Sequence, residues 1–132
     1  MLPAEGGCFC GAVRYRVLEA PRVSVICHCE SCRKVAGSPS LAWVCFAGSA
    51  FTWVRGQPRR YSSSPGVERT FCERCGTPLT YATAHRPSDV DVTTGSLDEP
   101  GAFPPTREIW LEDRIAWEAL DASRSAHSRS SA

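Results

Sequence analysis

The eight cysteines of this 132-residue chain constrain its fold more than any other feature of the sequence. Seven of them lie in three short motifs: Cys8-Phe9-Cys10, Cys27-His28-Cys29-Glu30-Ser31-Cys32 and Cys72-Glu73-Arg74-Cys75. In a reducing compartment, Cys-x-Cys and Cys-x-x-Cys spacings are typical of metal sites rather than of disulfides. We therefore expect the chain to fold around bound metal.

A reducing compartment is itself inferred from the sequence. Residues 1–7 show neither a basic segment nor an apolar one, so we expect no secretory signal. The longest unbroken apolar run, Leu41 to Ala47, is too short to cross a bilayer. We predict a cytoplasmic protein without membrane contact.

The cluster Cys27, Cys29 and Cys32 predicts a metal site with one free position. A Cys-x-Cys pair followed by a Cys-x-x-Cys turn can bring all three thiolates to one ion. Three protein ligands leave the fourth tetrahedral position to water or substrate, which is typical of catalytic zinc. We therefore assign these three residues to a catalytic zinc.

The other two motifs predict a structural zinc. Cys8 and Cys10 together with Cys72 and Cys75 supply four thiolates, enough for a closed tetrahedral site. Such a site joins distant parts of the chain, so its binding free energy stabilises the fold.

Three alternatives remain open. Cys29 and Cys32 could pair with Cys72 and Cys75 in a zinc ribbon, although roughly 40 residues separate the pairs, against roughly 15–20 in that motif. An oxidised protein could hold a Cys27–Cys29 or Cys29–Cys32 disulfide instead. The trio could also be a second structural site, completed by His28 or Cys45. We favour packing or a surface hydrogen bond for His28 and a buried apolar position for Cys45.

Short apolar or alternating segments, separated by Gly, Pro and Ser, predict an all-β domain made of small sheets with no long helix. We expect one domain over residues 1–122 and a mobile Ser- and Arg-rich tail over 123–132. A single helical turn is expected over Ser31 to Ala36, stopped by Gly37-Ser38-Pro39. Nine strands are expected near residues 12–17, 23–26, 41–46, 51–54, 59–62, 67–71, 78–83, 90–94 and 107–111.

Three ordered segments carry a resemblance to a known family. Residues 6–15 around Cys8 and Cys10, residues 27–34 and residues 71–79 resemble the glutathione-dependent formaldehyde-activating enzymes, a family that includes the CENP-V-type proteins. The resemblance implies a β-tent fold, a structural zinc on the Cys8 quartet and a second zinc on the Cys27 trio. It also implies condensation of glutathione with formaldehyde, a carbon–sulfur lyase reaction run in the synthetic direction.

Two classes of function follow. In the first, the protein is an enzyme that joins a small thiol such as glutathione to an aldehyde, with Arg33 and Lys34 holding a carboxylate of the thiol. In the second, it is a non-catalytic zinc scaffold of the CENP-V type that binds a protein or nucleic-acid partner. The formal charge of +1 gives no basic face for nucleic acid, and the tail offers only Arg124 and Arg129. We therefore favour the enzyme and expect no nucleic-acid partner.

Overall fold

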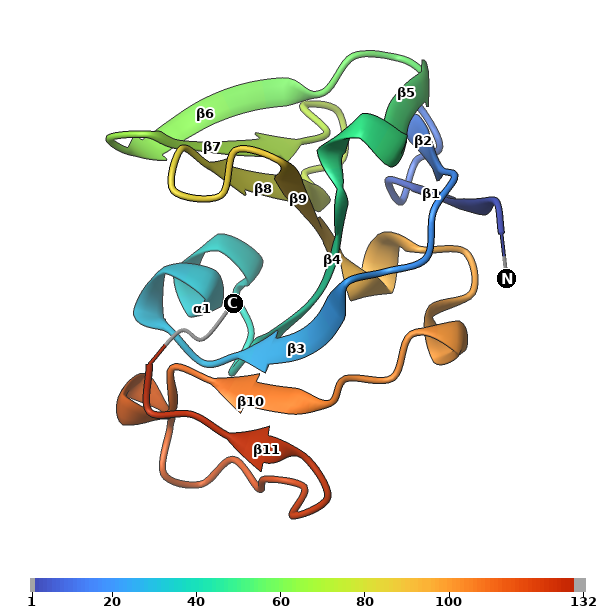
Figure 1. Ribbon diagram of the computed structural model, residues 1–132. Coiled ribbons are helices and arrows are strands. Elements are labelled where there is room, and N and C mark those ends of the chain that lie inside the picture. Colours follow the sequence, from blue (N-terminus) through green and yellow to red (C-terminus); the bar gives the residue numbers. More distant parts are fainter. Residues whose placement is uncertain (1, 130–132) are drawn as a thin grey trace.

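A computed structural model describes residues 2–129 and shows two β-sheets, one short α-helix and four single-turn 3-10 helices (Figure 1). The helix, α1, spans Glu30–Ala36 and ends where Gly37 adopts the left-handed conformation, at φ 63°. The prediction of an all-β fold is therefore confirmed. The strands are β1 (Ala4–Gly7), β2 (Arg14–Val17), β3 (Val23–Cys27), β4 (Leu41–Ala47), β5 (Phe51–Arg55), β6 (Arg59–Ser64), β7 (Val67–Phe71), β8 (Pro78–Thr83), β9 (Asp89–Thr93), β10 (Arg107–Ile109) and β11 (Ser125–Ala126).

The larger sheet has eight strands in the order β11-β10-β3-β4-β9-β8-β7-β6. Its neighbours are antiparallel except at β10, which pairs in parallel with both β3 and β11. Figure 1 shows β4 running between the β6–β8 end and the β3–β10 end, with α1 lying between these two ends. Residues from both ends line one pocket, so the sheet curls around the candidate site.

The smaller sheet, β1-β2-β5, covers the main apolar core. Tyr15 of β2 is fully buried there, and its hydroxyl lies 2.7 Å from Oγ of Ser96. Gly6 of β1 packs directly against this pair, since a Cβ at residue 6 would lie 2.4 Å from the Tyr15 hydroxyl. The strand β1 was not predicted. It forms because Gly-Gly can approach a buried tyrosine where a side chain cannot.

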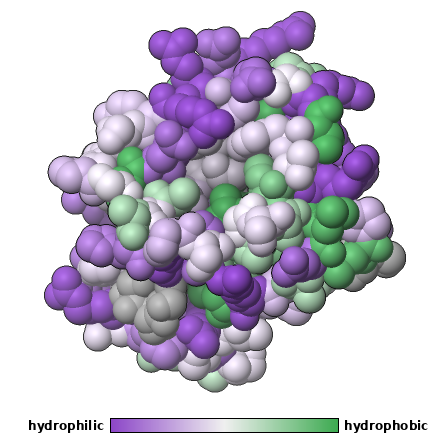
Figure 2. Space-filling model, turned by 45° about the horizontal axis from the view of Figure 1, so that its top comes forward, coloured by the Kyte–Doolittle hydropathy of each residue, from purple (hydrophilic) through white to green (hydrophobic). Residues whose placement is uncertain are grey.

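A second, smaller apolar cluster lies under the trio and contains Val25, Cys27, Cys32, Trp43 and Ile109. Figure 2 shows that hydrophilic residues cover much of one face of the molecule, with apolar residues gathered in a few patches. The largest fully buried side chains are mostly apolar or aromatic, among them Tyr15, Phe46 and Leu79. Across residues 2–129, no helix has the length and apolar character needed to cross a bilayer.

The segment after residue 122 was expected to be a tail without regular structure. Ser125–Ala126 instead form β11 at the edge of the large sheet, paired with Arg107 and Glu108 of β10. Arg124 also donates to Oε2 of buried Glu108 at 2.9 Å. Residues 130–132 lie outside the described part of the chain.

Candidate metal centres and pocket

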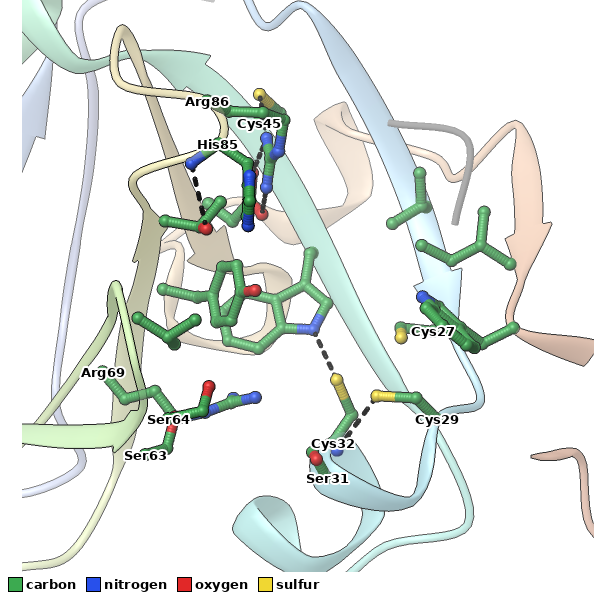
Figure 3. A pocket seen from close by; sticks show the side chains of 18 of the residues that line it. Cys27, Cys29, Ser31, Cys32, Cys45, Ser63, Ser64, Arg69, His85 and Arg86 are labelled. Atoms are coloured by element: carbon green, nitrogen blue, oxygen red, sulfur yellow. Dashed lines mark hydrogen bonds and ion pairs between the residues drawn. The ribbon is translucent and has the colours of Figure 1, made fainter. Parts of the chain in front are cut away.

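A pocket of about 650 Å³ opens between the two ends of the large sheet. One end of the pocket is formed by the Cys27 trio and the start of α1 (Figure 3). The opposite side is formed by β7, β8 and the loop that carries His85 and Arg86. A volume of this size accommodates a small molecule.

The sequence brings the trio together through a strand end and a helix start. Cys27 is the last residue of β3, and Cys29 is the N-cap of α1, where its Sγ accepts the backbone N–H of Cys32 at 3.3 Å. The three Sγ atoms lie within 4.8 Å of one another. Cys27 and Cys32 are buried, whereas Cys29 is partly exposed toward the pocket.

The trio also has electrostatics suited to metal binding. Hydrogen bonds from the Cys27 and Cys32 thiols lower the pKa of Cys29, and the positive charge of Arg69 contributes in the same direction. Because a thiolate, not a thiol, binds metal, this arrangement fits a metal site.

Two tryptophans shape the wall beside the trio. Trp43 Nε1 donates to Cys32 Sγ at 3.4 Å, and the ring of Tyr81 lies 6.0 Å from that of Trp43. Trp110 is the one non-glycine residue of the described chain with a positive φ, at 58°. A bulky residue in this region carries strain of roughly 1–3 kcal/mol, which is typical of functional sites.

His28 is not a fourth ligand of the trio. Its side chain is 1% exposed and points into the protein, with Nε2 2.6 Å from Glu108 Oε1 and Nδ1 3.0 Å from Glu118 Oε2. We expected packing or a surface hydrogen bond, and the structure shows packing between two carboxylates. Among residues 2–129, no further His, Cys, Asp or Glu joins the three sulfurs.

The second cluster contains Cys8, Cys10, Cys72 and Cys75, whose Sγ atoms also lie within 4.8 Å of one another. Sγ of Cys10 lies 3.6 Å from that of Cys8 and 3.8 Å from that of Cys72. A tetrahedral ion with bonds of about 2.3 Å to sulfur requires an edge of about 3.8 Å, so the quartet fits zinc. The hydrogen bonds of Cys75 with the side chain and backbone of Thr77 are the main causes that lower the pKa of Cys75 to about 5.

The positions of the cysteines in the structure decide between the alternative groupings that the sequence left open. Cys29 and Cys32 lie in one cluster and Cys72 and Cys75 in the other, which excludes the zinc ribbon. All eight cysteines are free, so the structure contains no disulfide in its described residues. Cys45 belongs to neither cluster. It is 6% exposed, and burial raises its pKa to about 12.

The comparison with known families agrees with the two clusters. A family described as glutathione-dependent formaldehyde-activating enzyme matches residues 3–113. The chain belongs to this formaldehyde-activating family. The resemblance carried by the cysteine motifs is therefore confirmed.

Individual relatives of this family are similar over different lengths. An uncharacterized lyase of Schizosaccharomyces pombe is 38% identical over 79 residues, which cover 59% of this chain and 56% of the relative. The chain therefore matches little more than half the length of that protein. A putative glutathione-dependent formaldehyde-activating enzyme of Halomonas elongata is 33% identical over 129 residues, 89% of this chain and 81% of the relative.

A crystal structure of a Rhodobacter sphaeroides protein has the same fold. The TM-score is 0.61 at 24% identity, over 71% of this chain and 87% of the other. At this identity the likeness concerns the fold alone. Together with the family match, it places this chain in the β-tent class that the resemblance implied.

The positively charged residues that line the pocket are not the ones that we predicted from the sequence to bind the substrate carboxylate. Arg33 and Lys34 lie on α1, but neither lines the pocket. The pocket is lined by Arg69 and Arg86 instead. Arg69 alternates with Val67 and Phe71 on one face of β7. A charged residue between two apolar residues on the same face of a strand is the sequence signal that could have identified Arg69 as a functional residue.

Proposed function

We propose that this protein is a zinc-dependent enzyme of the carbon–sulfur lyase type, which condenses glutathione or another small thiol with formaldehyde or a related aldehyde. The observation that carries the proposal is the trio itself. Three sulfurs converge at the end of a pocket of about 650 Å³, with no fourth side-chain ligand in the described chain. Family membership supports the same reaction.

Cys27, Cys29 and Cys32 hold the ion in this proposal, while Cys8, Cys10, Cys72 and Cys75 hold a structural zinc. Zinc held by these three residues would supply a positive charge that lowers the pKa of a bound substrate thiol, because the cation favours the charged form. Trp43 Nε1 donates to Cys32 Sγ and offsets part of the negative charge of the trio. The indole therefore holds Cys32 in its ligand position.

The reaction needs no oxidant or reductant. The thiol loses its proton, its sulfur bonds to the carbonyl carbon, and the electron pair of the C=O π bond passes to oxygen, which takes up a proton. The product is an S-hydroxymethyl thioether. The apolar wall of Val25, Trp43 and Ile109 limits access of water to the sulfur.

Arg33 and Lys34 remain proposed carboxylate-binding residues of the thiol. Both lie on α1 outside the pocket lining, so in this proposal they contact the part of a long thiol that extends beyond the pocket. Single changes of each to Met test this assignment through the KM for glutathione.

Turnover tests the proposed reaction. Zinc-loaded protein is mixed with ¹³C-formaldehyde and glutathione, and formation of S-hydroxymethylglutathione is followed by NMR. We expect a rate well above that of the uncatalysed condensation, and its loss in Cys29→Ser. As the control, the Cys29→Ser variant should retain one zinc per chain and the circular dichroism spectrum of the folded protein. An unchanged rate with wild-type protein contradicts the proposal and favours the non-catalytic scaffold.

A further inference from the structure

Arg69 is a buried cation that points into the pocket. It lies on β7, and only 8% of the residue is exposed. Its Nε donates to Ser63 Oγ at 3.1 Å, and its guanidinium carbon lies 4.8 Å from the centre of the Tyr81 ring. Figure 3 shows the guanidinium extending across the pocket toward Cys32. The ring and Ser63 fix the orientation of the guanidinium before any ligand binds.

The charge of Arg69 has no carboxylate partner among residues 2–129. Its Nη1 is buried without a hydrogen bond, and no ion pair involves this residue. A buried cation without an anion is unfavourable unless a partner arrives from outside. Within the pocket, Nη1 of Arg69 is therefore a buried donor without a hydrogen-bond partner.

Arg86, the other arginine of the pocket, shows the contrast. Its Nη2 lies 2.5 Å from Asp91 Oδ2, and its Nη1 lies 3.2 Å from Asp89 Oδ2. The two aspartates already neutralise this guanidinium. Of the two pocket arginines, Arg69 is the one left to meet an anionic ligand.

We propose that Arg69 binds a carboxylate of the thiol substrate and makes the pocket selective for anionic thiols. The proposal rests on the proposed function, since it places the thiol group at the trio and the carboxylate at Arg69. A guanidinium presents parallel N–H donors that match a carboxylate in a bidentate pair. Arg69 is thus a residue that determines substrate specificity. The sequence analysis, which selected Arg33 and Lys34, did not identify it.

A simpler role for Arg69 is to offset the negative charge of the thiolate trio. Under that role, replacing Arg69 weakens retention of the ion by the trio. The preference between charged and neutral thiols then stays the same. The two roles therefore differ in a measurable quantity, the ratio of affinities for a thiol with and without its carboxylate.

Calorimetry on the zinc-loaded full-length protein measures this ratio. The probes are glutathione against its diethyl ester, and 3-mercaptopropionate against 3-mercaptopropionamide, which is nearly the same size. We expect wild-type protein to bind each carboxylate thiol about 10- to 100-fold more tightly than its neutral counterpart. In Arg69→Met the ratio should fall to within about threefold, and Arg69→Lys should restore part of it.

Arg60→Met is the matched control. Arg60 lies on the neighbouring strand β6, is exposed and pairs with Glu68, away from the pocket. The Arg60→Met variant should keep the wild-type ratio of affinities for charged and neutral thiols. Zinc content and the thermal midpoint of each variant show whether the fold and both sites persist.

The outcomes separate this inference from the proposed function. A wild-type preference for carboxylate thiols that disappears in Arg69→Met supports the inference, even if formaldehyde is not converted. Turnover with glutathione and an unchanged ratio in Arg69→Met overturns the inference and leaves the proposed function intact. Equal affinity of wild-type protein for charged and neutral thiols, or no binding of either, also overturns it.

Discussion

The imidazole Nε2 of His28 lies 2.6 Å from Oε1 of Glu108, and both side chains are almost completely buried. His28 stands between two cysteines of the trio, and Glu108 lies on β10 beside β3. Glu108 also accepts from Arg124, which precedes β11. One carboxylate thus connects the candidate metal centre to the C-terminal segment.

Loss of this carboxylate should destabilise the fold. Glu108→Ala leaves His28 and Arg124 without their shared partner, and breaking a buried pair of this kind costs about 3–5 kcal/mol. Urea unfolding of the metal-loaded protein measures the loss. Glu112→Ala, which removes an exposed partner of Arg129, is the control and should change stability by at most about 0.5 kcal/mol. Equal effects of the two substitutions would contradict a structural role for the buried network.

The two cysteine clusters should respond differently to substitution. The quartet joins the turn before β2 to the turn between β7 and β8, so Cys8→Ser or Cys75→Ser should unfold the domain at room temperature. Cys29→Ser should leave it folded but inactive, because the trio lies within one short segment. Thermal melts followed by circular dichroism compare the three variants. A similar drop in melting temperature for all three would show that both clusters stabilise the fold alike.

Asp98 should titrate below its ordinary range. A bidentate hydrogen bond from Arg14, at 2.9 and 2.5 Å, lowers the pKa of this carboxyl. Because the folded-state pKa is depressed, the stabilisation is complete above about pH 4 and is lost as the pH falls through the folded pKa. Carboxyl ¹³C NMR should give a midpoint below 3.8 that returns toward this value in Arg14→Met. The pair is partly exposed, so it adds at most about 1 kcal/mol.

The eighth cysteine should be unreactive. Burial raises the pKa of Cys45 to about 12, so its thiol stays protonated at pH 8, and a protonated thiol is a poor nucleophile. With metal protecting the other seven, iodoacetamide should modify the folded protein very slowly. Mass spectrometry before and after denaturation locates the modified residue. Rapid alkylation of Cys45 in the folded protein would show an exposed thiolate instead.

Local patterns were sufficient for the central strands and for the three cysteine motifs. Leu41 to Phe46 is apolar on both faces, and β4 lies between β3 and β9 in the interior of the large sheet. Cysteine spacing separated the trio from the quartet, because each Cys-x-Cys or Cys-x-x-Cys motif closes within one turn of backbone. The strands and each single cysteine motif depend on residues close in sequence, whereas the quartet also joins Cys10 to Cys72 across 62 positions.

The residues that sequence reasoning missed depend on distant contacts. Arg69 reaches the pocket only because the sheet curls β7 toward α1, and Glu108 meets His28 only through the parallel pairing of β10 with β3. Ser125–Ala126 have no apolar pattern and become β11 through backbone pairing and Arg124. Contacts of this kind leave no local periodicity in the sequence.

The most direct test of the account is a titration of the cobalt-substituted protein with glutathione, followed by optical absorption of the metal. If the trio leaves one position free and the quartet is closed, one of the two cobalt centres should change its spectrum as the thiol binds. That change should be absent in Cys29→Ser, while the spectrum of the quartet stays constant. A spectrum that no thiol alters, or an equal response in Cys29→Ser, would contradict an open site at Cys27, Cys29 and Cys32.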